Sequence, residues 1–237
     1  MPDTLPNLTE ALLHAARRAG ADGADAMAVS GTSLSIDVRN GALEQAERAE
    51  GIEIGLRVLV GQRQACVAAS DISGRTIADM AERAVAMARE APDDSSIGLA
   101  DPADIARGWD AAALDLAEDA PEPTPAALEQ AARRAEAAAL AVPGITMSES
   151  AGASYSRRRF HIALSNGFSG GYARTFHSLA AVAITGEGTG MERDWAQEYR
   201  VYGSDLPAPE DIGTLAGERT AARKRARKPP TGAYPVF

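Results

Sequence analysis

A chain of 237 residues with 45% hydrophobic and 24% charged residues can bury one large core or two modest ones, so it needs no stabilising disulfide or metal. The net charge of −9 argues against nucleic acid as a major partner, because binding to phosphates depends on clustered Lys and Arg. The single cysteine, Cys66, excludes an intrachain disulfide and favours a reducing compartment, so we expect a cytoplasmic protein. We expect neither export nor a membrane span, because the N-terminus lacks a basic segment followed by an apolar run and no long apolar stretch occurs.

The first predicted elements are a helix and a strand. Apolar residues recur at helical spacing over residues 8–19, with Asn7 or Thr9 as the candidate N-cap and Gly20 as the stop. Residues 25–30 then alternate between polar and apolar side chains, which is typical of a strand with one buried face.

A β-meander is predicted next. Residues 33–38 alternate, and the following pair Asn40-Gly41 tolerates positive φ at both central positions of a type I′ hairpin turn. Residues 52–60 alternate before a glycine turn, and residues 64–69 leave that turn as another short strand. These patterns predict an antiparallel meander of three or four strands.

A second helix and a domain boundary complete the first half. Apolar residues form one stripe along residues 73–90, which predicts an amphipathic helix. The segment 114–125 is acidic and rich in proline, which is typical of a linker. We therefore expect an N-terminal α+β domain over residues 1–118 and a central α+β domain over residues 119–237, truncated before a C-terminal domain.

The second half repeats the plan of the first. Its predicted elements are a helix over residues 125–142, strands over 145–155, 159–165, 172–185 and 194–201, and a helix from 209 to about 227. Asn166 lies 126 residues after Asn40, and Gly186 lies 125 residues after Gly61. A duplicated helix, strand, hairpin unit would give this repeat, but any two meanders with Asn-Gly turns would also align, so both interpretations stay open. In either case the fold class is α+β, with antiparallel β-meanders packed against amphipathic helices.

Short motifs in both halves resemble the TldD/PmbA family, known as modulators of DNA gyrase and as a two-subunit cytosolic peptidase. They are Arg39-Asn40-Gly41, Ser70-Asp71, Ser165-Asn166-Gly167-Phe168 and the closing Pro-Thr-Gly-x-Tyr-Pro-Val. The resemblance covers nearly the whole chain, and it is strongest at residues 33–71 and 158–175. The motifs are more similar to PmbA, also called TldE, than to TldD.

The resemblance implies zinc chemistry in the catalytic subunit, where His-Glu-x-x-x-His places two imidazoles and a general base on one helix face. The three histidines of this chain, His14, His161 and His177, are not followed by Glu or paired at helical spacing. Either the chain is a truncated catalytic subunit, or it belongs to the PmbA side, whose members lack the metal. We favour the second explanation, so we assign no catalytic, cofactor-binding or metal-binding residue here and expect zinc in a TldD-like partner.

Other chemistry-bearing residues favour structural roles. His161 and His177 are 16 residues apart in predicted strands and could approach each other, but a zinc site needs three or four ligands, so hydrogen-bonded sheet histidines are favoured. Cys66 lies in an apolar strand, so we expect a buried thiol without a catalytic role. Ser70-Asp71 lacks a nearby His for a triad, and the Gly186 to Gly190 segment predicts a hairpin tip rather than a phosphate loop.

Two basic clusters, residues 157–159 and 223–228, are predicted to be solvated, because the chain is acidic overall. The favoured function is a non-metallated subunit of a TldD/PmbA-type peptidase complex, an oligomer that acts on peptides or unfolded proteins. Exposed strand edges would offer an extended peptide a place to pair. The alternatives are a binding or assembly module without a role in proteolysis, and a truncated zinc metallopeptidase.

Overall fold

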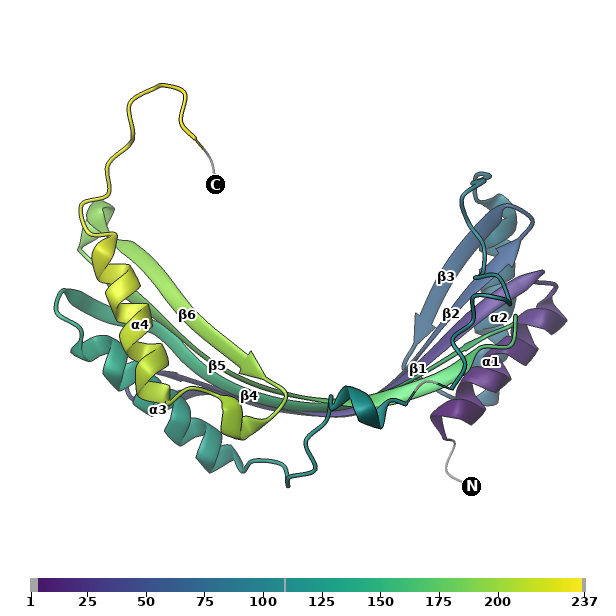
Figure 1. The fold of residues 1–237 in the computed structure, drawn as a ribbon, viewed down its shortest axis with the longest axis horizontal. Coiled ribbons are helices and arrows are strands. Elements are labelled where there is room, and N and C mark those ends of the chain that lie inside the picture. Colours follow the sequence, from purple (N-terminus) through teal and green to yellow (C-terminus); the bar gives the residue numbers. More distant parts are fainter. Residues whose placement is uncertain (1–3, 109, 236–237) are drawn as a thin grey trace. The chain divides into compact units, whose positions relative to one another are not determined.

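The computed structural model describes residues 4–108 and 110–235. The order helix, three strands, helix occurs twice along the chain (Figure 1). The first set comprises α1 (Leu5–Ala19), β1 (Gly23–Arg39), β2 (Ala42–Val60), β3 (Arg63–Ala69) and α2 (Gly74–Glu90). The second set comprises α3 (Pro125–Ala141), β4 (Ile145–Leu164), β5 (Ser169–Thr185), β6 (Glu192–Arg200) and α4 (Pro209–Ala222). The predicted α+β class is confirmed.

The strands form an antiparallel sheet in the order β3-β2-β1-β4-β5-β6. β3 pairs with β2 over its whole length, from Arg63 to Ala69, and β6 pairs with β5 from Glu192 to Arg200. β1 and β4, which begin the two sets of strands, are neighbours in the middle of this order. β3 and β6 are therefore the two edge strands.

Three strands are clearly longer than predicted, among them β2, which begins at Ala42 rather than at residue 52. The strands expected over residues 25–30 and 33–38 form one strand, β1, and those expected over residues 145–155 and 159–165 form β4. The expectation of separate strands was wrong because backbone pairing with neighbouring strands continues through residues 31–32 of β1 and 156–158 of β4 regardless of their side chains. At Gly31 of β1 the two strands approach closely: a Cβ there would contact the Arg157 carbonyl oxygen and the Arg158 side chain of β4.

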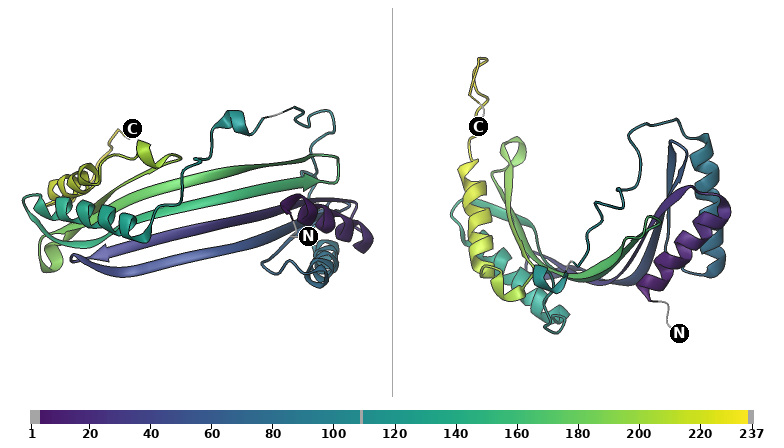
Figure 2. Two further views of the ribbon diagram at one scale, coloured as in Figure 1. Left: turned by 90° about the horizontal axis from the view of Figure 1, so that it is seen from below. Right: turned by 45° about the vertical axis from the view of Figure 1, so that its right-hand side comes forward.

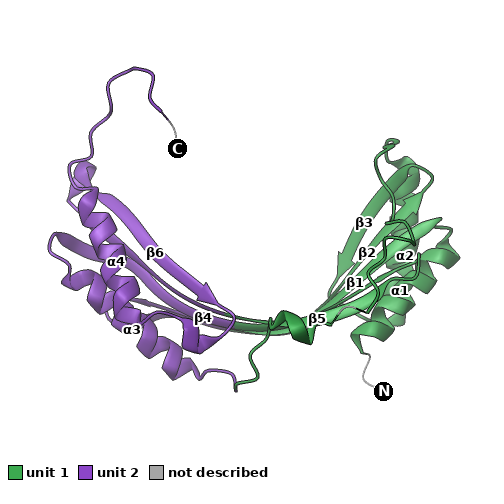
Figure 3. Cartoon of the chain, in the orientation of Figure 1, with its two compact units in different colours: residues 1–33, 48–120, 156–176 green, residues 34–47, 121–155, 177–237 purple. Residues whose placement is uncertain are grey.

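The chain divides into two compact units, and neither is continuous in sequence (Figure 3). Unit 1 comprises residues 1–33, 48–120 and 156–176, and unit 2 comprises residues 34–47, 121–155 and 177–237. Both units draw on β1, β2, β4 and β5, because each of these strands contributes residues to both. The sequence-based division into residues 1–118 and 119–237 treats each domain as one continuous segment, and it stays a prediction.

In unit 1, α1 and α2 lie side by side and pack on the same face of the strands (Figure 2). Ala24, Ala26 and Ala28 of β1 and the alternate residues Ile54, Leu56 and Val58 of β2 form the strand side of the core. The predicted apolar stripe of α2 is confirmed as its buried face: Ile77, Met80, Ala81, Ala84, Val85 and Ala88. Small alanines on β1 allow the helices to approach the sheet closely.

The start of α1 differs from the prediction. The helix begins at Leu5 with Thr4 as its N-cap, whose side-chain oxygen accepts a hydrogen bond from the Asn7 N–H. Neither candidate cap, Asn7 or Thr9, is correct. Pro6 occupies the first turn, where a missing N–H costs nothing, and Thr9 is buried inside the helix. The predicted stop at Gly20 is confirmed, with φ of 96°.

In unit 2, α3 and α4 pack together against the strands. The predicted stripe of α3, Leu128, Ala132, Ala135 and Ala139, is buried, and Thr124 caps the helix as expected. Two glycines of α4 permit the close helix pairing: a Cβ at Gly213 would contact the Ala135 backbone, and one at Gly217 would contact Val142. α4 itself ends at Ala222, earlier than predicted, and Arg223 beyond it pairs with Asp194.

The β1–β2 turn is held by a buried carboxylate. Asn40 and Gly41 have φ of 53° and 70°, as predicted for a type I′ turn. Their N–H groups donate to the two carboxylate oxygens of Glu136 on α3, at 2.8 and 2.7 Å. Glu136 is only 2% exposed, and Arg133 of the same helix donates to the Gly41 carbonyl oxygen. The sequence analysis did not predict this link between the turn and the helix.

Among the helices of the described residues, none combines the length and apolar character needed to cross a membrane.

Replacing Glu136 should destabilise unit 2. We expect Glu136→Leu to lower the free energy of unfolding by about 2 kcal/mol or more, because it leaves two backbone N–H groups without their acceptors. Glu136→Gln, which keeps one acceptor oxygen, should lose less. Urea denaturation followed by circular dichroism measures the difference. Glu129→Gln on the same helix is the matched control, since its partly exposed pair with Arg133 contributes only a few tenths of a kcal/mol. Equal losses in Glu136→Leu and the control would contradict the assignment.

Candidate functional site

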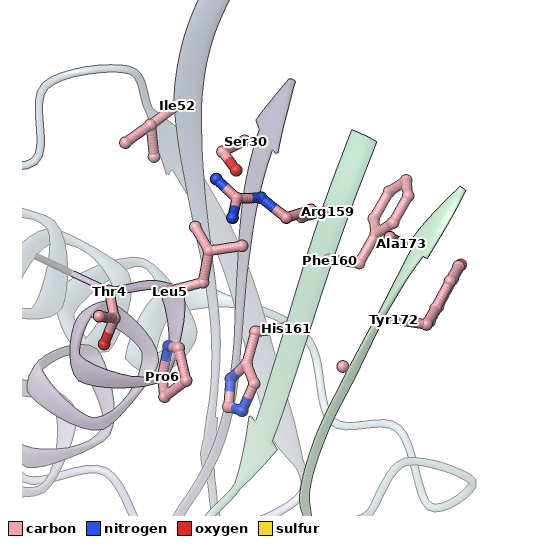
Figure 4. Close-up of a pocket in the computed structure, with 11 residues that line it drawn as sticks. Thr4, Leu5, Pro6, Ser30, Ile52, Arg159, Phe160, His161, Tyr172 and Ala173 are labelled. Carbon is pink, nitrogen blue, oxygen red and sulfur yellow. The ribbon is translucent and has the colours of Figure 1, made fainter. Parts of the chain in front are cut away.

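A pocket of about 540 Å³ lies in unit 1 at the beginning of α1 (Figure 4). Residues that begin α1 and residues of β1, β2, β4 and β5 line it: Thr4, Leu5, Pro6, Ser30, Ile52, Arg159, Phe160, His161, Gly171, Tyr172 and Ala173. All of these residues belong to unit 1. We call this the Arg159 pocket.

Strand alternation decides which side chains face the pocket. Arg159 and His161 are two residues apart on β4 and project from one face, whereas Phe160 projects from the other. The Phe160 and Tyr172 rings stack with their centroids 4.9 Å apart and point away from His161 (Figure 4). The stacked rings of Phe160 and Tyr172 therefore lie on the face of β4 and β5 opposite to His161.

His161 is held by hydroxyl groups on both sides of its ring. Its Nδ1 lies 2.8 Å from Thr9 Oγ1, and its Nε2 lies 3.3 Å from Ser169 Oγ. Thr9 Oγ1 donates its own proton to the Pro6 carbonyl oxygen, so it accepts from His161, and the proton of the neutral ring is on Nδ1. Burial lowers the pKa of His161 below its usual value, so the ring is neutral at pH 7.

Arg159 supplies the positive charge of the pocket. Its side chain is exposed and has no hydrogen bond or ion pair within residues 4–108 and 110–235. No Asp or Glu is among the described residues that line the pocket. Arg157, two residues earlier on the same face, pairs with Asp119 at 3.5 Å instead. The pocket thus combines one available guanidinium group with the apolar side chains of Leu5, Pro6 and Ile52.

Gly171 on β5 makes room for His161. A Cβ at this position would contact the Phe160 carbonyl oxygen and lie 3.2 Å from His161 Cδ2. The glycine therefore leaves space for the imidazole next to β5.

The three histidines do not meet. His14 is on the exposed side of α1, 3.6 Å from Glu10, and His161 lies in the Arg159 pocket of unit 1. His177 belongs to unit 2, where its ring meets the edge of Tyr155 at a centroid distance of 5.0 Å. Within the described residues, no group of three or more His, Cys, Asp or Glu side chains could hold a metal ion.

The expectation of a buried Cys66 was wrong. Cys66 is exposed, because its neighbours Ala65 and Val67 are the β3 residues that face the helices. Asp71 of the Ser70-Asp71 motif organises the start of α2: hydrogen bonds from Thr76 and Ser73 hold the pKa of its carboxyl below the usual value. The Gly186 to Gly190 segment joins β5 to β6, as predicted for a hairpin tip.

The sequence analysis placed residues 157–159 in a solvated cluster and His161 in a strand, but it did not join them into a pocket. The sequence does not show that these segments are neighbours in space, since Thr4, Ser30 and Ile52 approach β4 only in the folded unit. The alternation of Arg159, Phe160 and His161 was visible and could have indicated two polar side chains on one face.

Comparisons with known proteins give the same family over both halves of the chain. A model described as PmbA/TldA metallopeptidase domain 1 matches residues 24–88, and a model described as PmbA/TldA metallopeptidase central domain matches residues 118–224. These matches confirm the resemblance expected from the motifs.

Two curated relatives are similar in sequence. The chain is 34% identical over 218 residues to Metalloprotease PmbA of Escherichia coli O157:H7, covering 91% of this chain and 48% of the relative. It is 28% identical over 227 residues to a Metalloprotease PmbA homolog of Haemophilus influenzae, covering 94% of this chain and 49% of that relative. The chain thus spans about half the length of the curated relatives it matches.

Solved structures share the fold. A protein of Bacteroides thetaiotaomicron described as a modulator of DNA gyrase superposes with a TM-score of 0.77 at 22% identity, over 95% of this chain and 51% of that one. TldE from Thermococcus kodakarensis superposes with a TM-score of 0.69 at 13% identity, over 90% of this chain and 47% of that one.

Substitution of Gly171 should test the close contact of β4 with β5. We expect Gly171→Ala to lower the free energy of unfolding by about 1 to 3 kcal/mol, because the new methyl group meets a backbone carbonyl that cannot move alone. Gly55→Ala on β2 is the control, since its Cβ would enter open space. Urea denaturation of both variants measures the effect, and an unchanged midpoint for Gly171→Ala would rule out the contact.

The lowered pKa of His161 predicts a pH dependence of stability. The unfolded chain takes up a proton near pH 6.5, whereas the folded chain does so only at lower pH, so stability falls as the pH drops below about 6.5. We expect His161→Gln to lose part of this fall between pH 5 and 7, where carboxylates with lowered pKa values stay ionised. The measurement is the urea midpoint at several pH values. A pH dependence in His161→Gln identical to that of the wild type would refute the prediction.

Proposed function

Because the chain belongs to the PmbA/TldD metallopeptidase family, we propose that it is part of the subunit of a cytosolic peptidase complex that does not itself hold zinc. A TldD-like partner would hold the zinc ion and supply the metal-bound water for hydrolysis. The substrates would be peptides or unfolded proteins. The two family matches, one in each half of the chain, are the observation that carries this proposal.

The assignment to the PmbA side rests on relatives and motifs. The curated relatives are PmbA proteins, and TldE of Thermococcus kodakarensis shares the fold. The name of the Escherichia coli relative describes that protein as a metalloprotease. Because the present chain spans about half of that relative, the activity of the complete protein is part of the proposal.

The edge strands differ in what they offer an extended peptide. On β6, side chains already occupy backbone carbonyls: Arg219 donates to Trp195, Thr220 donates to Asp194, and Arg200 donates to the preceding Tyr199. On β3, no side chain among the described residues bonds to the backbone between Ala65 and Ala69. Since peptide addition to a sheet requires free backbone groups, β3 is the better edge for it.

The test is peptide hydrolysis by the full-length protein, alone and mixed with a zinc-bearing TldD-like relative, each with and without a chelator. We expect cleavage only in the mixture and its loss with chelator, because the metal would come from the partner.

Two outcomes would contradict the proposal. Chelator-sensitive cleavage by the protein alone would identify a catalytic metallopeptidase of which this chain is one part. A stable complex without cleavage of any peptide or unfolded protein would identify a binding or assembly module.

A further inference from the structure

We propose that the Arg159 pocket binds the C-terminal carboxylate of a peptide whose last side chain is apolar. The inference rests on the proposed function for the choice of a peptide over other carboxylates. The recognition of an anionic group joined to an apolar one follows from unit 1 itself.

The charge of the pocket favours one carboxylate. Arg159 has no partner among the described residues, and no acidic side chain lines the pocket itself, while Glu50 lies in the adjacent depression that Arg159 also lines. His161 is neutral, and both of its nitrogens are engaged with hydroxyl groups. A guanidinium group presents a planar fork that matches the two oxygens of a carboxylate, and such paired charge-assisted bonds are among the strongest in proteins.

One hydroxyl group can complete the recognition. Ser30 has no hydrogen-bond partner within the described chain, and Figure 4 shows its hydroxyl beside the Arg159 guanidinium group. Ser30 can therefore donate to the same carboxylate that Arg159 binds. Thr4, which caps α1, lies farther from the guanidinium group, beyond Leu5 (Figure 4).

The walls and size of the pocket suit an apolar terminal residue. Leu5, Pro6, Ile52 and Ala173 supply aliphatic surface next to the guanidinium group. The volume of about 540 Å³ lies within the range of 300 to 1,000 Å³ that is usual for small-ligand pockets. An apolar side chain buried there would add hydrophobic binding energy to the ionic contact.

A phosphate group fits this chemistry less well. Sites for phosphate collect several donors, whereas this pocket has one guanidinium group. Another arginine on this face, Arg157, pairs with Asp119 and lines, together with Arg159, a neighbouring depression that also contains Glu50. The positive charge available for a dianion is therefore small.

Arg158 provides a matched control within the same strand. It neighbours Arg159 on β4, is also exposed, and has no ion pair among the described residues. Alternation directs it to the opposite face, where it lines a different depression. Arg159→Gln and Arg158→Gln remove the same charge from adjacent positions.

The experiment measures binding of a fluorescein-labelled hexapeptide ending in Leu to the full-length protein by fluorescence polarisation at about 0.15 M salt. The peptide is used with a free C-terminal carboxylate and with a C-terminal amide. We expect the acid to bind about tenfold or more tightly than the amide, because charge-assisted hydrogen bonds have this strength. Arg159→Gln should abolish the difference, and Arg158→Gln should preserve it.

Competition identifies the source of the carboxylate. Unlabelled acid peptide should displace the probe, whereas decanoate and inorganic phosphate at the same concentration should not. Equal binding of acid and amide, equal effects of the two arginine substitutions, or stronger displacement by decanoate or phosphate would overturn the proposal. The urea midpoint of Arg159→Gln is measured alongside, and it should equal that of wild type because the side chain is exposed.

Binding is measured in the presence of a chelator and without the zinc-bearing partner, so no cleavage is required. Acid-specific binding that depends on Arg159 would therefore support the inference even if the partner-dependent hydrolysis test failed. Conversely, partner-dependent hydrolysis without acid-specific binding would support the proposed function and reject the role of the pocket.

Discussion

Alternation of side chains along the strands controls both cores and the pocket, because within each unit the helices pack on one face of the strands. In unit 1 it places Ala24, Ala26 and Ala28 of β1 under α1 and α2. The same period directs Arg159 and His161 into one pocket and sends Phe160 to the other side. A shift of one residue in β4 would exchange these faces, so the register of the sheet and the pocket depend on each other.

Buried polar groups determine local geometry that apolar packing alone does not specify. The Glu136 carboxylate holds the turn between β1 and β2, and the hydroxyl of Thr9 sets the tautomer of His161. Each of these buried groups has its hydrogen bonds satisfied, which makes the geometry around it specific. Apolar burial alone would stabilise several neighbouring arrangements, whereas these contacts require one.

The family assignment concerns the role of the chain in a complex, whereas the pocket concerns the binding of one part of a peptide. The matches over both halves place the chain in the PmbA/TldD family, and the proposed role as the zinc-free side of a peptidase complex follows from its PmbA relatives. Arg159, which has no partner among the described residues, lies beside aliphatic side chains, and this arrangement is the basis for the proposed binding of a peptide end. In the proposed function β3 is the better edge for an extended peptide, because three carbonyls of β6, those of Asp194, Trp195 and Tyr199, already accept side-chain hydrogen bonds.

The sequence by itself determined the class of the fold, the helix stripes and the Asn40-Gly41 turn, because these features arise from periodicity and local backbone preferences. It also indicated the family through short motifs. Only the tertiary structure decided that β1 and β4 are single strands, that Cys66 is exposed and that Glu136 reaches the turn. The pocket likewise required the fold, because Thr4, Ser30 and Arg159 are distant in sequence and are brought together by strand order and register.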